Sequence, residues 1–196
     1  MPYSKNPSAA PLQISILLFD RFSNHCLANV LEPLRAANDL SGQQVFDWNI
    51  VVLAGQGVHS SSGLRLEADA QLADMRGDIL MVMPSYGFLT HANGTSSRAL
   101  RAAARRFDTL AGLDTGSWLF AQAGLLDGRR ATIHWDALDR LSGRFSEVDV
   151  QKEAVIYDRN RITCGGASTA FALARQLTGK QQGGATRLRV ENLVSC

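Results

Sequence analysis

The residues with the clearest capacity for chemistry lie in a short turn between an apolar run and a helical segment. Residues 109–113 predict a buried strand, and residues 116–124 predict the helix that follows it. Gly116 comes two residues after Asp114, which is typical of the strand-turn-helix corner that exposes a nucleophile. Here the exposed residue is an acid. Asp114 is also a favoured helix N-cap, accepting the amide of Ser117, and the two roles can coexist.

Other polar side chains follow other predicted strands. Ligands of an open α/β sheet bind at the carboxyl ends of its strands, so we expect a site there. His134 ends the predicted strand 130–134 and is a candidate to hydrogen-bond or charge-pair with Asp114; a structural histidine with satisfied nitrogens is the alternative. The predicted ligand-binding residues are Asn24, Cys26, Ser85, Tyr86, Asp114, Thr115, Trp118 and His134.

Two tryptophans and a cysteine near this region have plainer interpretations. Trp118 and Trp135 are each more typical of a core than of a ligand contact. An acid beside an aromatic face would nevertheless suit a cationic or quaternary-ammonium group, because both attract positive charge. Cys164 precedes two glycines at a helix start, where amides could receive an anion, but a buried, inert thiol is favoured.

Strands and helices alternate along most of the chain. The alternation predicts a doubly wound, mostly parallel sheet with helices on both faces, a flavodoxin-like three-layer sandwich. A kink or interruption is expected near Pro33, and residues 55–63 read as a loop. The predicted strands are 12–19, 48–54, 78–83, 109–113 and 130–134 with a hairpin at 155–163, and the predicted helices are 23–40, 97–107, 116–124, 136–141 and 167–178.

Composition sets the broad class. The 196 residues are 45% hydrophobic with a formal net charge of +2, which favours one compact domain at residues 12–178. Residues 1–11 read as a disordered polar leader and residues 179–196 as a boundary and tail. Three widely spaced cysteines indicate neither a zinc site nor a disulfide framework, so we expect no metal, no cofactor and a reducing cytoplasm. No run suits export or membrane insertion.

Three segments carry a resemblance to a known family. They are LDTGSWLFAQAGLLDGRRATIHW (113–135), EPLRAAN (32–38) and RITCGGASTA (161–170). Together they resemble the N-terminal domain of GlxA-type AraC-family transcription regulators, which is similar to ThiJ/PfpI proteins of the class I glutamine amidotransferase-like fold. Hydrolytic ThiJ/PfpI proteins pair an elbow cysteine with a histidine and use an acid after the first strand.

Carried onto this chain, that resemblance places the nucleophile at Asp114, the histidine at His134 and the acid on or close to Cys26. A carboxylate is a far weaker nucleophile than a thiolate, and a thiol at Cys26 cannot replace the acid. Pro84 stands where a glycine would offer an amide to an oxyanion. These departures predict that the domain is not an enzyme.

The resemblance implies a ligand-sensing homodimer whose effector is an amine, a betaine or an amino-acid-like metabolite. It also implies that DNA is bound only through a C-terminal helix-turn-helix domain. About 18 residues follow the last predicted helix, which is too few to form such a domain. The alternatives are a ThiJ/PfpI-type hydrolase or hydratase using Asp114 and His134, and a protein-interaction module with an empty cleft.

Overall fold

A computed structural model describes residues 10–194, so most of the predicted leader at 1–11 lies outside the described residues. Its centre is a seven-stranded sheet in the order β10-β11-β7-β6-β1-β2-β5, parallel except for the β10–β11 pair. The strands are β1 (Leu12–Leu18), β2 (Phe46–Val52), β5 (Ala70–Gln71), β6 (Gly77–Met83), β7 (Phe107–Leu113), β10 (Val155–Asp158) and β11 (Arg161–Cys164).

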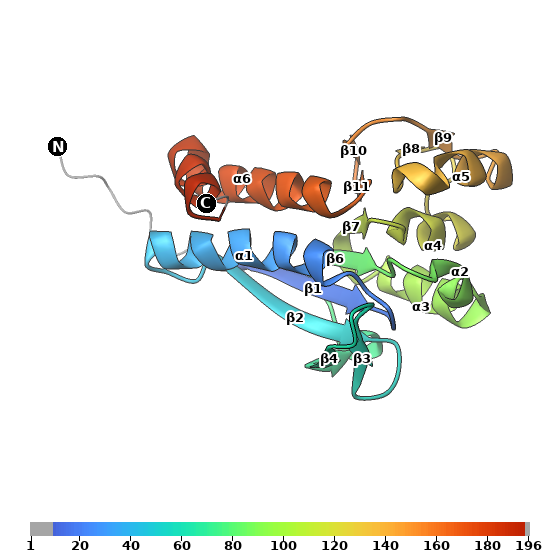
Figure 1. Cartoon of the computed structure of the whole chain (residues 1–196), viewed down its shortest axis with the longest axis horizontal. Helices are drawn as coiled ribbons and strands as arrows, with labels where there is room; N and C mark the ends of the chain where they lie inside the picture. The colour runs from blue at the N-terminus through green and yellow to red at the C-terminus, as the bar shows by residue number, and fades with distance from the viewer. Residues whose placement is uncertain (1–9, 195–196) are drawn as a thin grey trace.

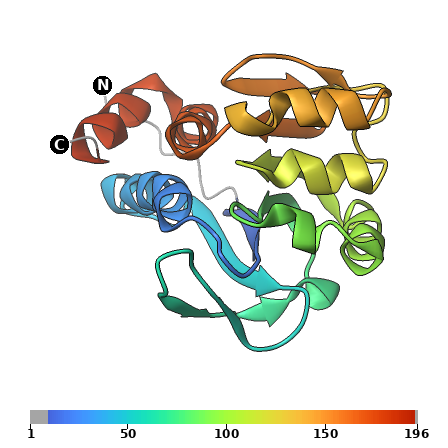
Figure 2. The same cartoon turned by 45° about the vertical axis from the view of Figure 1, so that its right-hand side comes forward.

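Helices cover both faces of the sheet, which confirms the predicted three-layer α/β class (Figures 1 and 2). The central strands form because their apolar runs are buried on both faces, as a parallel sheet between helices requires. One face is covered by α1 (Asn24–Ser41) and α6 (Ala167–Val194), and the other by α2 (Phe88–His91), α3 (Gly94–Ala103), α4 (Gly116–Gln122) and α5 (Leu138–Arg144). None of these helices is long and apolar enough to cross a membrane.

Shorter elements complete the fold. The antiparallel strands β3 and β4 project from the end of β2, and β8 pairs with β9 beside α5. Residues 55–63 therefore include a strand, and the prediction of a loop there was wrong in part. The short elements are β3 (Gly57–His59), β4 (Arg65–Glu67), β8 (Arg130–Ala131), β9 (Asp149–Val150) and the 3-10 turns η1 (Leu72–Asp74) and η2 (Trp135–Ala137).

Helix α1 follows β1 and is uninterrupted at Pro33, so the predicted interruption was wrong. Ser23 caps its start by accepting the amide of Cys26 at 3.2 Å, and Gly42 ends it in the left-handed conformation. Pro33 is buried on the apolar face of α1. Packing of that face offsets the single backbone hydrogen bond that proline removes.

Local capping explains where two predicted boundaries differ from the structure. The helix expected at 97–107 is α3, which starts earlier because the Asn93 side chain accepts the amides of Thr95 and Ser96. It ends at Ala103, and Phe107 already belongs to β7. The strand expected at 130–134 is only β8, because the chain turns into η2 at Trp135.

The C-terminal helix continues well past residue 178, where the prediction ended it. Helix α6 has one break, at Gly183, whose φ of 82° and ψ of 171° suit only glycine. The part after the break folds back, and Arg175 before it forms an ion pair with Glu191 after it. Lys180, Gln181 and Gln182 are good helix formers, so the predicted loop at 179–184 was wrong before Gly183.

Gly116 at the start of α4 allows the sheet and helix to approach closely. A Cβ on this residue would lie 2.2 Å from the carbonyl oxygen of Val82 in β6. We predict that Gly116→Ala lowers the free energy of unfolding by about 1–3 kcal/mol, because backbone atoms must move to admit the methyl group. Urea unfolding followed by circular dichroism measures the change.

Gly143→Ala is the matched control. Gly143 lies within α5, has no neighbouring atom within 4 Å of the added Cβ and does not have positive φ. Here alanine should raise stability by about 0.5–1 kcal/mol, through its better helix propensity. Equal effects at the two positions would contradict the role assigned to Gly116.

Candidate ligand-binding site

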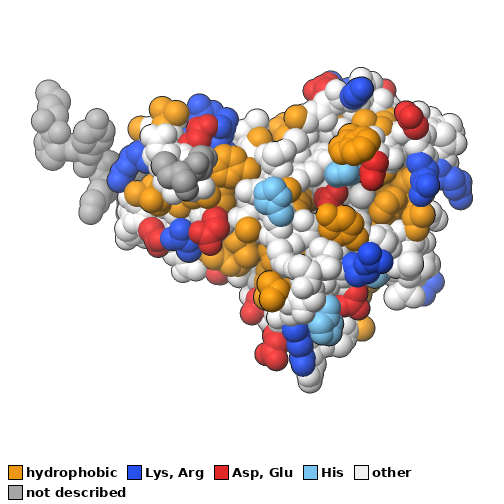
Figure 3. Space-filling model, in the orientation of Figure 1, with side chains coloured by type: hydrophobic (Ala, Val, Ile, Leu, Met, Phe, Trp, Pro, Cys, Tyr) orange, Lys and Arg blue, Asp and Glu red, His pale blue; other side chains and the backbone are white. Residues whose placement is uncertain are grey.

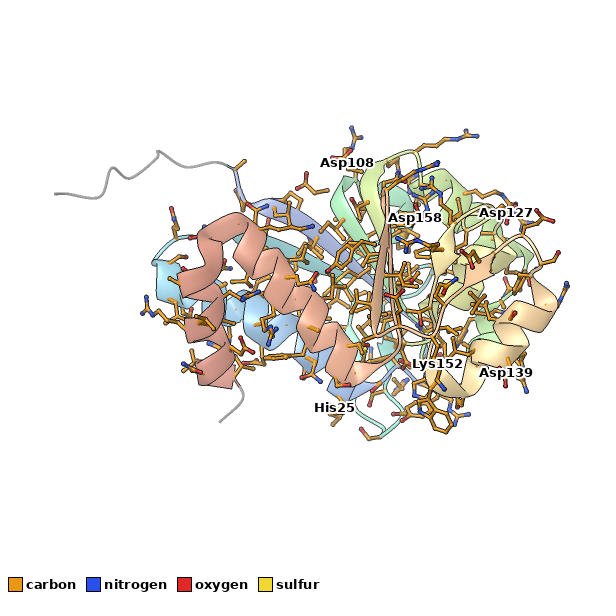
Figure 4. The ribbon with its side chains drawn as sticks, turned by 90° about the horizontal axis from the view of Figure 1, so that it is seen from above. His25, Asp108, Asp127, Asp139, Lys152 and Asp158 are labelled. Atoms are coloured by element: carbon orange, nitrogen blue, oxygen red, sulfur yellow. The ribbon has the colours of Figure 1, made fainter. Side chains whose placement is uncertain are left out.

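Three strand ends at one edge of the sheet hold their backbones in a sparsely populated conformation. Arg21 after β1, Ser85 after β6 and Asp114 after β7 have φ of 69°, 50° and 59°. Such left-handed non-glycine residues are uncommon and collect at functional sites. In Figure 4, His25 at the start of α1 and Asp108 near the start of β7 lie at opposite edges of the molecule, and the His25 edge is the carboxyl edge.

The corner at Asp114 is a turn between β7 and α4, as predicted, but its capping differs. Helix α4 starts at Gly116 with Thr115 as its N-cap, and no side chain caps it. The expected Asp114 cap on the Ser117 amide was therefore wrong. The Thr115 hydroxyl instead donates to the carbonyl of Ser85 at 2.8 Å and ties together the ends of β6 and β7.

Buried hydrogen bonds fix the corner from behind. The Ser117 hydroxyl donates to the Thr132 carbonyl at 2.6 Å, and the Thr132 amide donates to the Thr163 hydroxyl at 2.9 Å. The amide of His134 donates to the carbonyl of Asp114 at 2.9 Å. These bonds join α4, the segment after β8 and β11, so the Asp114 and His134 backbones occupy a common rigid frame.

The Asp114 carboxyl is partly desolvated. Burial raises its pKa, and Asp136 contributes in the same direction; the Ser85 hydroxyl and His134 act in the opposite direction. The Ser85 side chain is only 3% exposed, and its Oγ makes no hydrogen bond that satisfies normal geometry. The Ser85 hydroxyl thus lies beside the Asp114 carboxyl and favours its charged form, although the two groups fall short of regular hydrogen-bond geometry.

The His134 ring pairs with a residue that the sequence reading missed. Its Nδ1 lies 2.7 Å from Oδ1 of Asp136, whereas no hydrogen bond joins the ring to the Asp114 carboxylate. The predicted hydrogen bond to Asp114 is therefore not formed, whereas the alternative of a charge interaction agrees with the effect of His134, which lowers the pKa of that carboxyl. An acid two residues after His134 was the available signal. Asp136 orients the imidazole.

Exposed aromatic side chains flank the corner. Trp135 is 75% exposed, with its ring centroid 5.6 Å from that of His134, so the prediction that it lies in the core was wrong. Tyr86 is 55% exposed, and its amide lies 3.3 Å from the Arg21 carbonyl. Figure 3 shows hydrophobic, acidic and histidine side chains together near the start of α5. This is an apolar surface beside negative charge.

Other predicted site residues are placed differently. Trp118 is 5% exposed and packs edge-on against Phe88 and Phe145, at centroid distances of 5.3 and 5.2 Å. That placement agrees with the core interpretation. Asn24 binds the hydroxyls of Ser60 and Ser62 beyond β3, so its amide group serves that loop.

Cys26 and Cys164 are buried beneath this edge of the sheet. Burial raises the pKa of Cys26 well above its usual value, and burial raises the pKa of Cys164 to about 11. Both thiols are protonated at neutral pH, so neither is a nucleophile. The inert interpretation of Cys164 agrees with this environment.

A hollow of about 480 Å³ lies beside the corner without including it. It opens at the carboxyl ends of β1 and β2 and against the first turn of α3. The expectation of a site at the carboxyl ends of the strands includes this position, but none of its lining residues is among the predicted ligand-binding residues. The polar side chains of its lining are Asp20, His91, Asn93, Thr95, Ser96 and Arg98.

The arrangement holds a half-buried carboxylate, an oriented imidazole and an unpaired hydroxyl at one rigid corner. It can bind a small polar molecule and can exchange protons with it. Within residues 10–194, no group of three or more His, Cys, Asp or Glu side chains is arranged to hold a metal ion.

The fold and the strained corner define a class of α/β domains built around a nucleophile-elbow turn. The family model of the DJ-1/PfpI family matches residues 13–180, and the chain belongs to that family. This membership confirms the ThiJ/PfpI-like resemblance seen in the sequence.

Several known proteins are similar to this chain. The HTH-type transcriptional regulator GbdR of Pseudomonas aeruginosa is 33% identical over 183 residues, which cover 93% of this chain and 49% of GbdR. The crystal structure of an AraC family transcriptional regulator from Pseudomonas putida superposes with a TM-score of 0.81 at 25% identity, covering 94% of this chain and all of that one. Isonitrile hydratase of Pseudomonas putida is 29% identical over 187 residues, covering 92% of this chain and 78% of the enzyme. The chain spans about half the length of GbdR.

We predict that Asp114→Asn raises the melting temperature at pH 7 by roughly 2–4 °C, the shift that about 1 kcal/mol gives in a chain of this size. Folding raises the pKa of Asp114, so the folded state binds this proton more tightly than the unfolded state. Its contribution favours folding below the unfolded pKa and is lost as pH rises through the folded pKa. At pH 7 the buried, charged Asp114 carboxylate therefore lowers the free energy of unfolding. Asparagine carries no charge, so it removes this loss, and it still tolerates positive φ.

The difference in melting temperature between variant and wild type should therefore shrink as the pH falls from 7 towards 4. Differential scanning calorimetry at several pH values measures it. Asp108→Asn, on the exposed start of β7, is the matched control and should leave the melting temperature unchanged. A variant less stable than wild type at pH 7 would contradict the desolvation argument.

Proposed function

We propose that this chain is the ligand-sensing domain of an AraC-family transcription regulator and that its effector binds at the Asp114 corner. The observation that carries the proposal is Asp114 itself. A half-buried carboxylate occupies the tip of a strained elbow, beside His134 and the unpaired Ser85 hydroxyl. Keeping a charged group desolvated there lowers stability, and a ligand of opposite charge recovers that loss.

The same corner supports binding without turnover. A carboxylate attacks carbonyl carbons poorly compared with a thiolate, and both nearby thiols are buried and protonated. Pro84 offers no backbone amide at the end of β6. The domain therefore lacks the nucleophile and one amide donor of an acyl-transfer site.

The charges and exposed rings favour a cationic effector. Asp114 and Asp136 both lie near His134, and no arginine or lysine pairs with either acid within residues 10–194. Tyr86 and Trp135 offer ring faces that attract positive charge. We propose an amine, a betaine or an amino-acid-like metabolite as the effector.

The wider assembly follows from the regulator relatives. We propose that residues 12–178 form the sensor unit, with residues 179–196 as its boundary, in a cytoplasmic homodimer. DNA is then bound by a helix-turn-helix domain C-terminal to this segment and by no residue described above. Effector binding would act by stabilising one arrangement of the dimer over another.

One observation favours a second function, a hydrolase or hydratase. The 2.7 Å contact between His134 and Asp136 orients an imidazole beside a carboxylate, as a general base would require. Isonitrile hydratase is among the similar proteins. If the domain is a hydrolase or hydratase, Asp114 acts as the base or nucleophile and His134 carries the proton.

Thermal shift with a metabolite panel tests the proposed sensor. We expect at least one of glycine betaine, L-arginine or putrescine, at about ten times its dissociation constant, to raise the wild-type melting temperature by roughly 3–6 °C. Asp114→Asn should lose this response because it removes the charge that faces the cation. Product analysis of the same mixtures by mass spectrometry measures turnover.

Three variants separate the alternatives. Asp108→Asn should respond like wild type, since its carboxylate lies at the opposite edge of the sheet. If Arg98→Gln loses the response while Asp114→Asn keeps it, the effector occupies the 480 Å³ hollow instead. Turnover that disappears in Asp114→Asn would establish the enzyme. A response to malate or citrate alone would refute the cationic class, and no response to any compound would refute the sensor.

A further inference from the structure

Helix α6 carries a formal net positive charge larger than that of the whole chain. The chain has a formal net charge of +2, yet α6 alone holds four basic residues and one acid. The basic residues are Arg175, Lys180, Arg187 and Arg189, and the acid is Glu191. The rest of the chain is therefore slightly negative, and this helix is electrostatically distinct from the Asp114 corner.

The break at Gly183 turns α6 into a hairpin with a close inner face. Arg175 and Glu191 pair across it, which neutralises one of the four cations. Farther towards the turn, the aliphatic part of Arg187 packs on Gly179, where an added Cβ would meet Arg187 Cδ at 3.2 Å. Val190 is fully buried against the core that α1 and α6 share, so the second half is held in place.

A cleft of about 360 Å³ lies on this hairpin. Its lining is Gln176, Gly179, Lys180, Gly184 and Arg187, which contains two cations and no acid. In Figure 1 the far, red end of α6 lies at the opposite end of the molecule from α5. The cleft is thus separate from the Asp114 corner and from the 480 Å³ hollow.

The two cations of this cleft lack neutralising partners. Among residues 10–194, neither Lys180 nor Arg187 forms an ion pair. The Nε of Arg187 is buried and makes no hydrogen bond, while the Lys180 ammonium is held 5.0 Å from the centre of the Tyr157 ring. A guanidinium whose Nε is desolvated and that has no ion pair is stabilised by a negative charge placed beside it.

We propose that the α6 cleft binds a small oxyanion, which bridges Lys180 on the first half of the hairpin and Arg187 on the second. Phosphate and carboxylate share the required chemistry, because each offers several oxygen acceptors to a guanidinium and an ammonium. Bound there, the anion neutralises two like charges carried by the two halves of the hairpin. It therefore stabilises the closed hairpin.

Thermal unfolding in inorganic phosphate tests the proposal. At constant ionic strength set with sodium chloride, phosphate should raise the wild-type melting temperature saturably, by roughly 3–6 °C at about ten times its dissociation constant. Lys180→Gln and Arg187→Gln should each weaken binding at least about tenfold in isothermal titration calorimetry. A parallel titration with acetate shows whether the cleft accepts carboxylates as well as tetrahedral oxyanions.

Arg189→Gln is the matched control, since Arg189 lies on the same half of α6, is exposed and does not line the cleft. It should bind phosphate like wild type. Phosphate also stabilises proteins non-specifically by exclusion from their surface. An unsaturable rise that is equal in all four proteins would therefore overturn the proposal, as would calorimetry showing no phosphate binding to wild type.

Discussion

The close approach of the Gly116 backbone to the carbonyl of Val82 is the constraint on which the candidate site depends. Because no side chain separates them, α4 begins directly against the end of β6. The chain must then reverse between β7 and α4 within two residues, and Asp114 takes up the reversal with positive φ. The bond from Thr115 to Ser85 fixes the end of β6 to the same turn. Sheet packing thus determines where the carboxylate lies.

Electrostatics at the corner follows from that placement. A flexible turn would let Asp114 rotate into water, but the buried bonds of Ser117 and Thr132 hold its backbone. The carboxylate stays partly desolvated, with Asp136 as a second acid nearby and His134 interacting with both. A positively charged ligand relieves repulsion and desolvation together, whereas an anion would add to both. Under the proposed function, charge therefore discriminates between classes of ligand before shape does.

Sequence reasoning located the corner because its signals are local. Residues 107–122 carry an apolar strand, a turn and a glycine at fixed spacing, and these determine the backbone whatever surrounds them. The partner of His134 was missed because Asp136 lies in η2, where a predicted strand end gave way to a turn. Trp135 was misplaced for the same reason, since a residue expected to follow a buried strand instead begins that exposed turn.

The lining of the hollow and of the α6 cleft could not be predicted from the sequence, for a different reason. The hollow is formed by elements that are distant in sequence, and the cleft depends on the direction in which α6 folds back after Gly183. Hydrophobic periodicity specifies neither. Gly183 indicated a break, but nothing in the local pattern shows that Arg187 returns to Gly179. The stabilising contact between Arg175 and Glu191 spans sixteen residues, far outside the three- or four-residue spacing by which helix pairs are recognised.

Helix α6 runs from the neighbourhood of one candidate site to the other. Gly166, the residue before its start, lies beside the His134 ring, where an added Cβ would be 3.4 Å from Cδ2, and the far part of α6 forms the basic hairpin. About 22 Å of regular helix separates the two ends. Coupling between sites requires a shared element whose arrangement both ligands bias, and the same free energy then acts in both directions. Helix α6 begins one residue after Gly166, beside the His134 ring, and its helical geometry is broken only at Gly183 within the described residues, so it is the element shared by the two neighbourhoods.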